Sequence, residues 1–404
     1  MKSLYIAAAL SFLLLTLSCT KEGEILPTFE ENNEVIPVED ALELVIEYAK
    51  LLYPETRSDL NLSVSDAITL TKKDLPKATR STASSEIPDT TLYIFNFANN
   101  SGYAVASANR KYGKTLFCIT ESGRLSAEDF APIHTRVSGD STDIHSGTHF
   151  ITELLTASIM ANEIAPPDST EVGGGPGGII GPFLMTKWGQ SISPFNDSTY
   201  YNYPAGCTVI AVAQIMAYEE YANTMVFNGV LCDWDDMKTV HTFPSINDSG
   251  STLGKIQVAN FIKELGAENN CDLTYTPTGS PGSDFNAKKT LNNYGYSATM
   301  TPLIPSPSFT HNMHSRVRTQ LFSGRPVYVG AMRSISEGHA WVIDGFFAGL
   351  YHINWGWLGD NDGYFSAGIF SIADRVSTSS IDPGSMRPES YNYSFGFHII
   401  TYTL

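Results

Sequence analysis

The chain has 404 residues, more than one ordinary domain holds, and its length predicts two or three domains. Hydrophobic residues make up 42% of it and charged residues only 17%, a composition that indicates folded domains and excludes a disordered chain. The formal net charge is −17. A nucleic-acid-binding protein needs a basic surface, so this charge argues against that class of function.

Residues 1–19 have the pattern of an export signal. An apolar run follows Lys2, and it is shorter than the about 20 residues that a membrane-spanning helix needs. The run ends at Cys19 in a sequence that resembles a bacterial lipoprotein box, although Thr16 stands where that box usually has Leu. Two outcomes stay open: a lipid on Cys19 that anchors the protein at the membrane or cell surface, or cleavage as an ordinary signal peptide. Both predict export from a bacterial cell.

The next region, residues 20–163, is predicted to be a small α+β domain that follows a polar tether over 20–36. Helical spacing of apolar residues, β-rich runs and an Asn99-Asn100-Ser101-Gly102 turn signal define its elements. We expect helices over 38–52 and 148–161, and strands over 91–97, 103–108 and 114–120.

Residues 164–182 are rich in glycine and proline, which predicts an exposed linker. The segment lacks the Gly-Lys-Ser/Thr end of a phosphate-binding loop, and no strand precedes it. Exposed linkers are preferred sites of proteolytic cleavage, so we expect processing here.

A second domain is predicted over 183–404. The helix over 208–218 is apolar nearly all round, which indicates that it is buried centrally. This pattern predicts an α+β fold in which a helical part packs on an antiparallel sheet. The other expected elements are a helix over 253–265 and strands over 326–331, 340–347, 351–355, 364–366 and 395–402.

Cys207 is the first candidate for catalysis, because it lies at the start of the apolar helix. Unpaired N–H groups and the helix dipole stabilise a thiolate there, and the thiolate is the nucleophilic form. A buried structural cysteine is the alternative interpretation. The remaining cysteines form no Cys-x-x-Cys pair, and Cys232 and Cys271 are either free or paired with each other.

Two further residues have the spacing that a cysteine nucleophile needs. His339 precedes a strand and has the pKa range to accept the thiol proton. Asn354 offers a carbonyl oxygen to the imidazole N–H, and Trp355 would shield that hydrogen bond from water. His339 and Asn354 follow Cys207 by 132 and 147 residues, within the about 130–150 typical of papain-like enzymes. A structural histidine and core aromatic residues are the alternatives.

Attack on an amide develops negative charge on oxygen, so an oxyanion hole is required. The backbone N–H of Cys207 is one donor, and a side-chain amide upstream is the usual second. Gln190 lies 17 residues before the cysteine. Gln214 is the other candidate, but it lies inside the helix and is expected to face away from the helix start.

Three motifs of the second domain resemble the streptopain-like cysteine peptidases of bacteria. They are Gly206-Cys207 with Ala211-Val212-Ala213-Gln214-Ile215-Met216, then Gly338-His339-Ala340-Trp341-Val342-Ile343-Asp344-Gly345, then His352-Ile353-Asn354-Trp355-Gly356-Trp357 with Asp362-Gly363-Tyr364-Phe365. The first domain resembles the propeptide of that family in Phe95-Asn96-Phe97, Gly102-Tyr103-Ala104-Val105-Ala106-Ser107-Ala108 and Thr120-Glu121-Ser122-Gly123.

The resemblance implies a papain-like catalytic domain in which Cys207 is the nucleophile and His339 the base. Gln190 would fill the oxyanion position, and Asn354 and Trp355 would orient and shield the imidazole. The chemistry is acyl transfer to the thiol followed by hydrolysis, which needs no metal and no organic cofactor.

The resemblance also implies a zymogen whose N-terminal region, to about residue 175, covers the active site and is cut away at the linker. The expected partners are protein or peptide substrates with an apolar residue two places before the scissile bond, and the chain's own prodomain as inhibitor. A membrane is expected only through a lipid on Cys19, and no nucleic acid is expected.

Some features depart from that family or carry little weight. Leu358 follows Trp357 where relatives often have glycine, and residues 373–391 are expected to form a mobile loop. Residues 360–363 resemble a calcium loop, but Ile369 stands where such a loop needs glutamate. A thiol acyltransferase or amidase on the same scaffold remains open, as does a non-catalytic surface-binding lipoprotein, which should have lost a catalytic group.

Overall fold

The computed structural model describes most of the chain from residue 34 onward. The export segment, Cys19, the helix expected over 148–161 and most of the linker lie outside the described residues. Residues 34–404 belong to one compact unit. The described residues are 34–53, 64–71, 89–110, 113, 115–125, 178–191, 193–196, 203–240, 251–277, 279–333, 337–366, 368, 370–374, 389–393 and 395–404.

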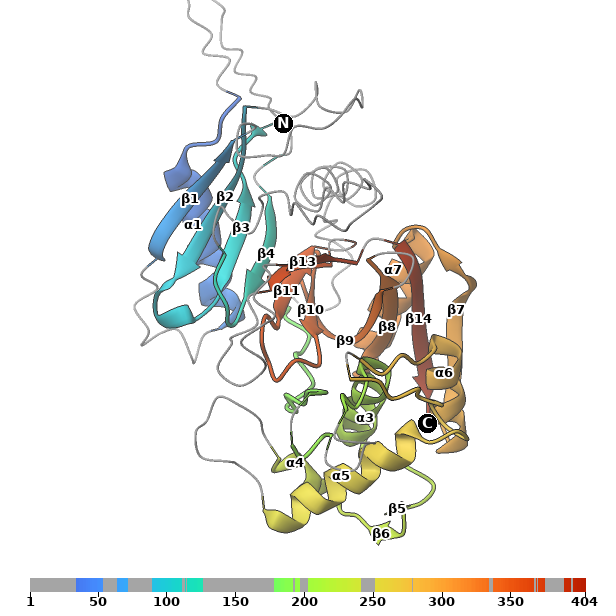
Figure 1. The fold of residues 1–404 in the computed structure, drawn as a ribbon. Helices are drawn as coiled ribbons and strands as arrows, with labels where there is room; N and C mark the ends of the chain where they lie inside the picture. The colour runs from blue at the N-terminus through green and yellow to red at the C-terminus, as the bar shows by residue number, and fades with distance from the viewer. Residues whose placement is uncertain are drawn as a thin grey trace, which may run out of the picture. The chain divides into compact units, whose positions relative to one another are not determined.

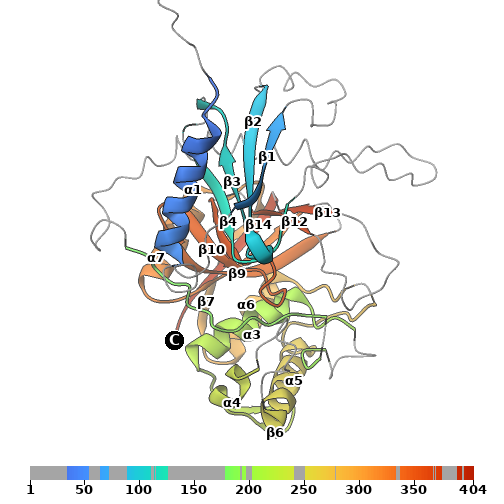
Figure 2. The same cartoon turned by 90° about the vertical axis from the view of Figure 1, so that its left-hand side faces the viewer.

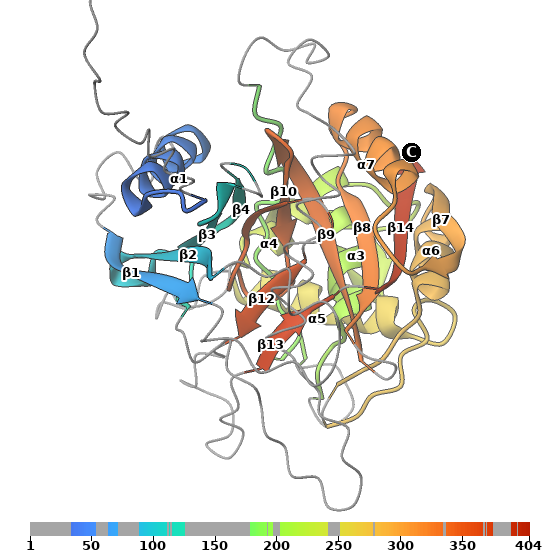
Figure 3. The ribbon, with the colours of Figure 1, turned by 90° about the horizontal axis from the view of Figure 1, so that it is seen from above.

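A ten-stranded antiparallel sheet is the centre of the fold. Its strand order is β1-β2-β3-β4-β11-β10-β9-β8-β14-β7, which Figure 3 shows from β1 across to β7. The strands are β1 (Val64–Thr71), β2 (Thr90–Phe97), β3 (Tyr103–Ser107), β4 (Leu116–Thr120), β7 (Ser297–Ser306), β8 (Val327–Met332), β9 (Gly338–Phe347), β10 (Leu350–Asn354), β11 (Gly363–Ser366) and β14 (Phe395–Thr403). Two small two-stranded sheets pair β5 (Val226–Phe227) with β6 (Val230–Leu231), and β12 (Ser371–Asp374) with β13 (Glu389–Asn392).

The sheet runs without a break across the two regions that the sequence predicts as separate domains. Strand β4 of the N-terminal region pairs with β11 of the C-terminal region, with Ile119 opposite Tyr364 (Figure 1). Beyond the strands, Glu121 N–H donates to the carbonyl of Asp362 at 2.8 Å. Edge strands present unpaired N–H and C=O groups, and here those groups of β4 and β11 hydrogen-bond to one another.

Six α-helices of the described residues have these bounds: α1 Val38–Leu52, α3 Cys207–Glu219, α4 Trp234–Lys238, α5 Thr252–Gly266, α6 Asp284–Asn293 and α7 His311–Phe322. A 3-10 turn over Ala98–Asn100 joins β2 to β3. Helix α1 covers strands β2, β3 and β4 (Figure 2). None of the helices that the structure describes is long and apolar enough to span a membrane.

Side chains alternate between the two faces of the sheet, and this places α3 and α7 on opposite sides. In β9, Trp341 and Ile343 pack in one core cluster with α7, whereas Ala340 and Val342 pack in another with α3. Helix α3 lies between the sheet and helices α5 and α6. Its ten buried residues explain why its sequence is apolar nearly all round.

The predicted α+β fold is confirmed, including helix α1 with the expected bounds. The sequence analysis missed strands β1 and β7, the short strands β5, β6, β12 and β13, and helices α4, α6 and α7. Helices α6 and α7 are polar, and the N-caps Ser283 and Thr310 mark where they begin. Of the expected loop at 373–391, the ends contribute to β12 and β13, and residues 375–388 lie outside the described part.

The end of the predicted linker is packed against the sheet. Ile180 exchanges two backbone hydrogen bonds with Phe346 of β9, at 2.8 and 3.0 Å. Gly181 follows with a φ of 70°, and a Cβ there would lie 2.2 Å from the carbonyl oxygen of Asp344. A cut in the linker that leaves this contact intact therefore falls before Ile180.

The close approach of β4 and β11 gives a test of the junction between them. A Cβ on Gly363 would lie 2.4 Å from the carbonyl oxygen of Ile119. We expect Gly363→Ala to lower the free energy of unfolding of the full chain by about 1–3 kcal/mol, the usual cost of overpacking. Gly279→Ala is the control, since a Cβ there meets no atom within 4 Å. Equal denaturation midpoints for the two variants would contradict the expectation.

Candidate active site

Cys207 is the first residue of α3, the position that the sequence predicts. The chain enters the helix through Gly206, whose φ is 92°. A Cβ on Gly206 would lie 2.7 Å from the carbonyl oxygen of Ser280, so the turn requires glycine. Because α3 is buried in the core, this turn fixes the thiol at a defined place over strand β9.

Opposing influences act on the pKa of the Cys207 thiol. Burial raises the pKa and is the largest influence. Hydrogen bonds from the backbone of Ala340 and Thr208 lower it, but they do not compensate. The pKa therefore lies above its ordinary value, and the neutral thiol predominates at pH 7.

His339 is the second residue of strand β9 and lies among aromatic rings. The nearest is Trp357, whose ring centroid is 4.6 Å from that of the imidazole, and Tyr393, Trp341 and Trp355 follow at 5.4–6.2 Å. This burial lowers the pKa of His339 to about 4. The imidazole is therefore neutral at pH 7.

The carbonyl oxygen of Trp355 holds the imidazole at Nε2, at 2.8 Å. Because a carbonyl only accepts, Nε2 carries the proton and Nδ1 keeps the lone pair that a base needs. Among the described residues, no hydrogen bond joins the imidazole to the thiol of Cys207. The structure therefore contains both groups in neutral form and not paired with each other.

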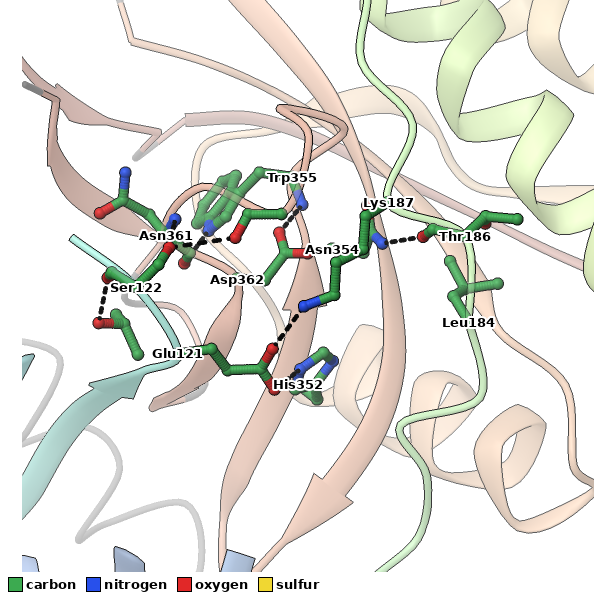
Figure 4. A network of polar contacts seen from close by, with 12 residues as sticks. Glu121, Ser122, Leu184, Thr186, Lys187, His352, Asn354, Trp355, Asn361 and Asp362 are labelled. Atoms are coloured by element: carbon green, nitrogen blue, oxygen red, sulfur yellow. Dashed lines mark hydrogen bonds and ion pairs between the residues drawn. The ribbon is translucent and has the colours of Figure 1, made fainter. Parts of the chain in front are cut away.

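Asn354 does not orient the imidazole in this structure, which corrects that part of the sequence interpretation. Its Oδ1 accepts from Gln214 Nε2 at 2.9 Å and from Gly356 N–H at 3.0 Å. Its Nδ2 donates to the carbonyl of Thr186 at 2.9 Å (Figure 4). The reason is the alternation along the strands, which turns Asn354 toward α3 and His339 toward the opposite face.

Trp355 is fully buried against the imidazole, with the two ring planes 24° apart. Its backbone N–H donates to Asp362 at 2.9 Å, and its indole N–H donates to the carbonyl of Asn361 at 3.1 Å. Residues 359–362 thus fix the segment whose carbonyl holds His339.

Gln190 is brought to the loop before the nucleophile by its backbone. Its carbonyl accepts from Ala205 N–H at 2.6 Å, and Gly189 forms a bridge with Trp357. Gln190 is half-buried beside the turn into α3. Gln214 instead lies two helical turns further along and bonds the chain at Trp188.

A chain of ionic contacts links the N-terminal region to the site (Figure 4). Glu121 accepts from Lys187 at 2.8 Å and lies 3.4 Å from His352 Nε2. His352 Nδ1 is 2.6 Å from Asp344. Burial opposes charge on His352, but Asp344 and Glu121 outweigh it and raise its pKa to about 10. The same contacts hold the pKa of Glu121 well below its ordinary value, against burial.

Sequence analysis missed this network. Glu121, Asp344 and His352 all fall within the motifs that resemble the family, but they are far apart in the chain and their motifs give no sign of a shared contact. Cys118, Cys232 and Cys271 are free, so the alternative disulfide is not formed. Within the described residues, no group of three His, Cys, Asp or Glu could hold a metal ion.

Comparisons with known proteins agree with this geometry. Residues 188–365 match the model of the Peptidase C10 family. Streptopain of Streptococcus pyogenes serotype M28 is 22% identical over 314 residues, which cover 69% of this chain and 74% of that protein. The thiol protease/hemagglutinin PrtT of Porphyromonas gingivalis is 26% identical over 176 residues, which cover 40% of this chain and 20% of that protein.

A solved structure shares the fold. A fragment of prointerpain A from Prevotella intermedia covers 83% of this chain and 98% of its own length, with a TM-score of 0.51 and 20% identity. At this coverage the likeness extends into both the N-terminal and the C-terminal region of the chain.

The state of the thiol can be tested by its reactivity. We expect alkylation of Cys207 by iodoacetamide in the full chain to be slow at pH 7 and to rise about tenfold per pH unit toward pH 9, because only the thiolate reacts. Peptide mass spectrometry between pH 5 and pH 10 would measure it. Burial raises the pKa of the other described cysteines to about 11 or 12, so they react later. An alkylation rate of Cys207 that stays constant between pH 5 and pH 8 would instead indicate a thiolate–imidazolium pair.

The Glu121 contact predicts a pH-dependent contribution to stability. Because the pKa of Glu121 is lowered, its contribution to the free energy of unfolding is complete above pH 4.5, the ordinary pKa of the group, and decreases as the pH falls. Because the pKa of His352 is raised, its contribution to the free energy of unfolding is complete below pH 6.5 and decreases as the pH rises toward about 10. We expect Glu121→Gln to lower the free energy of unfolding by about 3 kcal/mol, most between pH 4.5 and pH 6.5.

Asp235→Asn is the matched control for that measurement, because Asp235 pairs with Lys238 on the surface and is 91% exposed. Exposed pairs contribute little. A Glu121→Gln effect no larger than that of the control, or one that grows above pH 8, would contradict the expectation.

Proposed function

The chain is a streptopain-like cysteine peptidase, and we propose that it is an exported endopeptidase made as a zymogen. Its N-terminal region, residues 20–163, is the inhibitory prodomain, and the linker over 164–182 is the processing region. The peptidase domain begins near residue 183. Export is supported by the signal pattern that ends at Cys19.

One observation carries this proposal: three distant segments meet at the start of α3. Residues 188–190 and 205–207 are joined by the hydrogen bond between Gln190 and Ala205. Residues 355–358 join them through the bridge between Gly189 and Trp357. A thiol, an imidazole-holding segment and a side-chain amide are thereby gathered around one helix N-terminus, which is the arrangement that acyl transfer to a thiol needs.

We assign the steps as follows. Nδ1 of His339 takes the proton of the Cys207 thiol, and the sulfur attacks the carbonyl carbon of the peptide. The backbone N–H of Cys207 and the side-chain amide of Gln190 stabilise the oxyanion. The imidazolium then donates its proton to the leaving amine as the C–N bond breaks. Water hydrolyses the acyl-enzyme with His339 again as base, which restores the thiol.

The described chain fits the inactive form of such an enzyme. The imidazole is held by the Trp355 carbonyl, and this segment is braced by the prodomain. Ser122 Oγ accepts from Asn361 N–H at 3.0 Å and donates to the carbonyl of Gly359 at 3.2 Å. We propose that removal of the prodomain releases residues 359–362, so that His339 can turn to Cys207 and the ion pair can form.

Finer properties belong to the same proposal. A lipid on Cys19 would hold the enzyme at the membrane or cell surface, and substrates would carry an apolar residue two places before the scissile bond. A thiol acyltransferase or amidase would use the same groups on another amide. A non-catalytic binding lipoprotein is less consistent with a chain that retains Cys207, His339, Asn354 and Gln190.

A mass-spectrometric time course tests the proposal on residues 20–404 under reducing conditions, with Cys207→Ala as the control. We expect the wild type to be cut in the linker before Ile180 and Cys207→Ala to stay whole. If neither is cut, trace trypsin is added and a peptide with an apolar second residue is assayed. No hydrolysis after linker cleavage would refute the peptidase, whereas hydrolysis would mean processing by another protease.

A further inference from the structure

We infer that Gln214 is a positioning residue of the peptidase, which holds the oxyanion segment over 186–190 in register with the nucleophile helix. This inference rests on the proposed function. Gln214 lies in the middle of α3 and is fully buried. It is seven residues after Cys207, so two helical turns place both side chains on the same face of the helix. The sequence interpretation that it faces away from the site is therefore corrected.

Every polar atom of the Gln214 side chain has a partner in the site. Its Oε1 accepts from the backbone N–H of Trp188 at 3.1 Å and from Thr186 Oγ1 at 3.1 Å. Its Nε2 donates to Asn354 Oδ1 at 2.9 Å. One side chain thus bonds both the segment that leads to Gln190 and the end of strand β10.

A second side chain closes these contacts into a ring. Asn354 Nδ2 donates to the carbonyl of Thr186 at 2.9 Å (Figure 4). Asn354 Oδ1 also accepts from Gly356 N–H at 3.0 Å. Gln214, Asn354 and Thr186 therefore bond one another in a buried ring. The ring joins α3, the oxyanion segment and the turn at residues 354–356. The carbonyl of Trp355 in that turn holds His339.

The position of Gln190 relative to Cys207 depends on this ring because two of the points at which its segment is held join it to α3 and to the loop before the nucleophile. Gln214 holds it at Trp188, and Ala205 N–H holds it at the Gln190 carbonyl at 2.6 Å. The second point lies on the loop that leads into Cys207. Without the first, the segment keeps the Ala205 bond, the bridge between Gly189 and Trp357 and the indole hydrogen bond from Trp188 to Val240, but it loses its hydrogen bond to α3 and with it the register between Gln190 and Cys207. A displacement of about 1 Å can cost about a hundredfold in rate.

The chemistry of the helix supports a specific role over simple packing. A buried amide costs free energy unless each of its polar atoms is hydrogen-bonded, and an apolar side chain of similar volume fills such a space without that requirement. Gln214 is surrounded along α3 by buried apolar residues, such as Ala213 and Ile215. Only its hydrogen bonds distinguish it from a methionine at this position.

The test therefore replaces Gln214 by methionine, which keeps the volume and removes the hydrogen bonds. The matched control is Gln257→Met. Gln257 is also a buried glutamine in a helix, 3% exposed, and its side chain also accepts from a backbone N–H, that of Asp233 at 3.1 Å. It bonds Asp236 and no residue of the site.

In linker-cleaved enzyme we expect Gln214→Met to lower kcat for an amide substrate about 30- to 100-fold and to change KM less than threefold. Alkylation of Cys207 by iodoacetamide should stay within twofold of wild type, because that reaction develops no oxyanion. A general collapse of the site would lower both rates. Gln257→Met should change neither. Unchanged kcat in a folded Gln214→Met enzyme would overturn the inference.

A second measurement does not depend on activity. Backbone amide exchange over 186–190 is followed by mass spectrometry in the full chain with Cys207→Ala. We expect Gln214→Met to accelerate exchange there at least tenfold and Gln257→Met to leave it unchanged. Unchanged exchange in Gln214→Met refutes the ring as a support. Absence of peptide hydrolysis in the wild type refutes the proposed function instead, so the two failures are distinguishable.

Discussion

The pairing of β4 with β11 is the constraint on which the described state of the site depends. It joins two edge strands, so that the N-terminal region extends the sheet of the peptidase region. The chain leaves β4 directly into Glu121 and Ser122, which contact Lys187, His352 and the turn at 359–362. Backbone pairing supplies the register, and the ionic contacts then follow from that register.

The same register reaches His339, the proposed base, in two steps. Ser122 braces the turn, and Asp362 of the turn accepts the backbone N–H of Trp355. The carbonyl of Trp355 holds His339 among aromatic rings, where burial lowers the pKa of the imidazole to about 4. Burial acts on Cys207 in the opposite sense and raises the pKa of its thiol. Low polarity favours the neutral form of both groups, so an ion pair requires that they meet.

On the other face of the sheet, buried amide side chains hold α3, residues 186–188 and the end of β10 together. The ring of Gln214, Asn354 and Thr186 lies on the α3 side, away from the aromatic cluster around His339. The two faces of the sheet thus differ: one carries Cys207 and residues 186–190, and the other carries His339, whose neighbouring turn at 359–362 contacts the N-terminal region. The physical basis is the alternation of side chains along β9 and β10.

Local sequence patterns were sufficient to predict the α+β class, the bounds of α1, the burial of α3 and the place of Cys207 at a helix start, because periodicity and glycine turns act locally. The candidate residues came from spacing and resemblance. The long-range contacts in the folded chain show that the two regions share one sheet, that the Trp355 carbonyl and not Asn354 contacts His339, and that Gln214 bonds Asn354. Edge pairing, strand alternation and buried hydrogen bonds join residues far apart in the chain, and no local pattern records them.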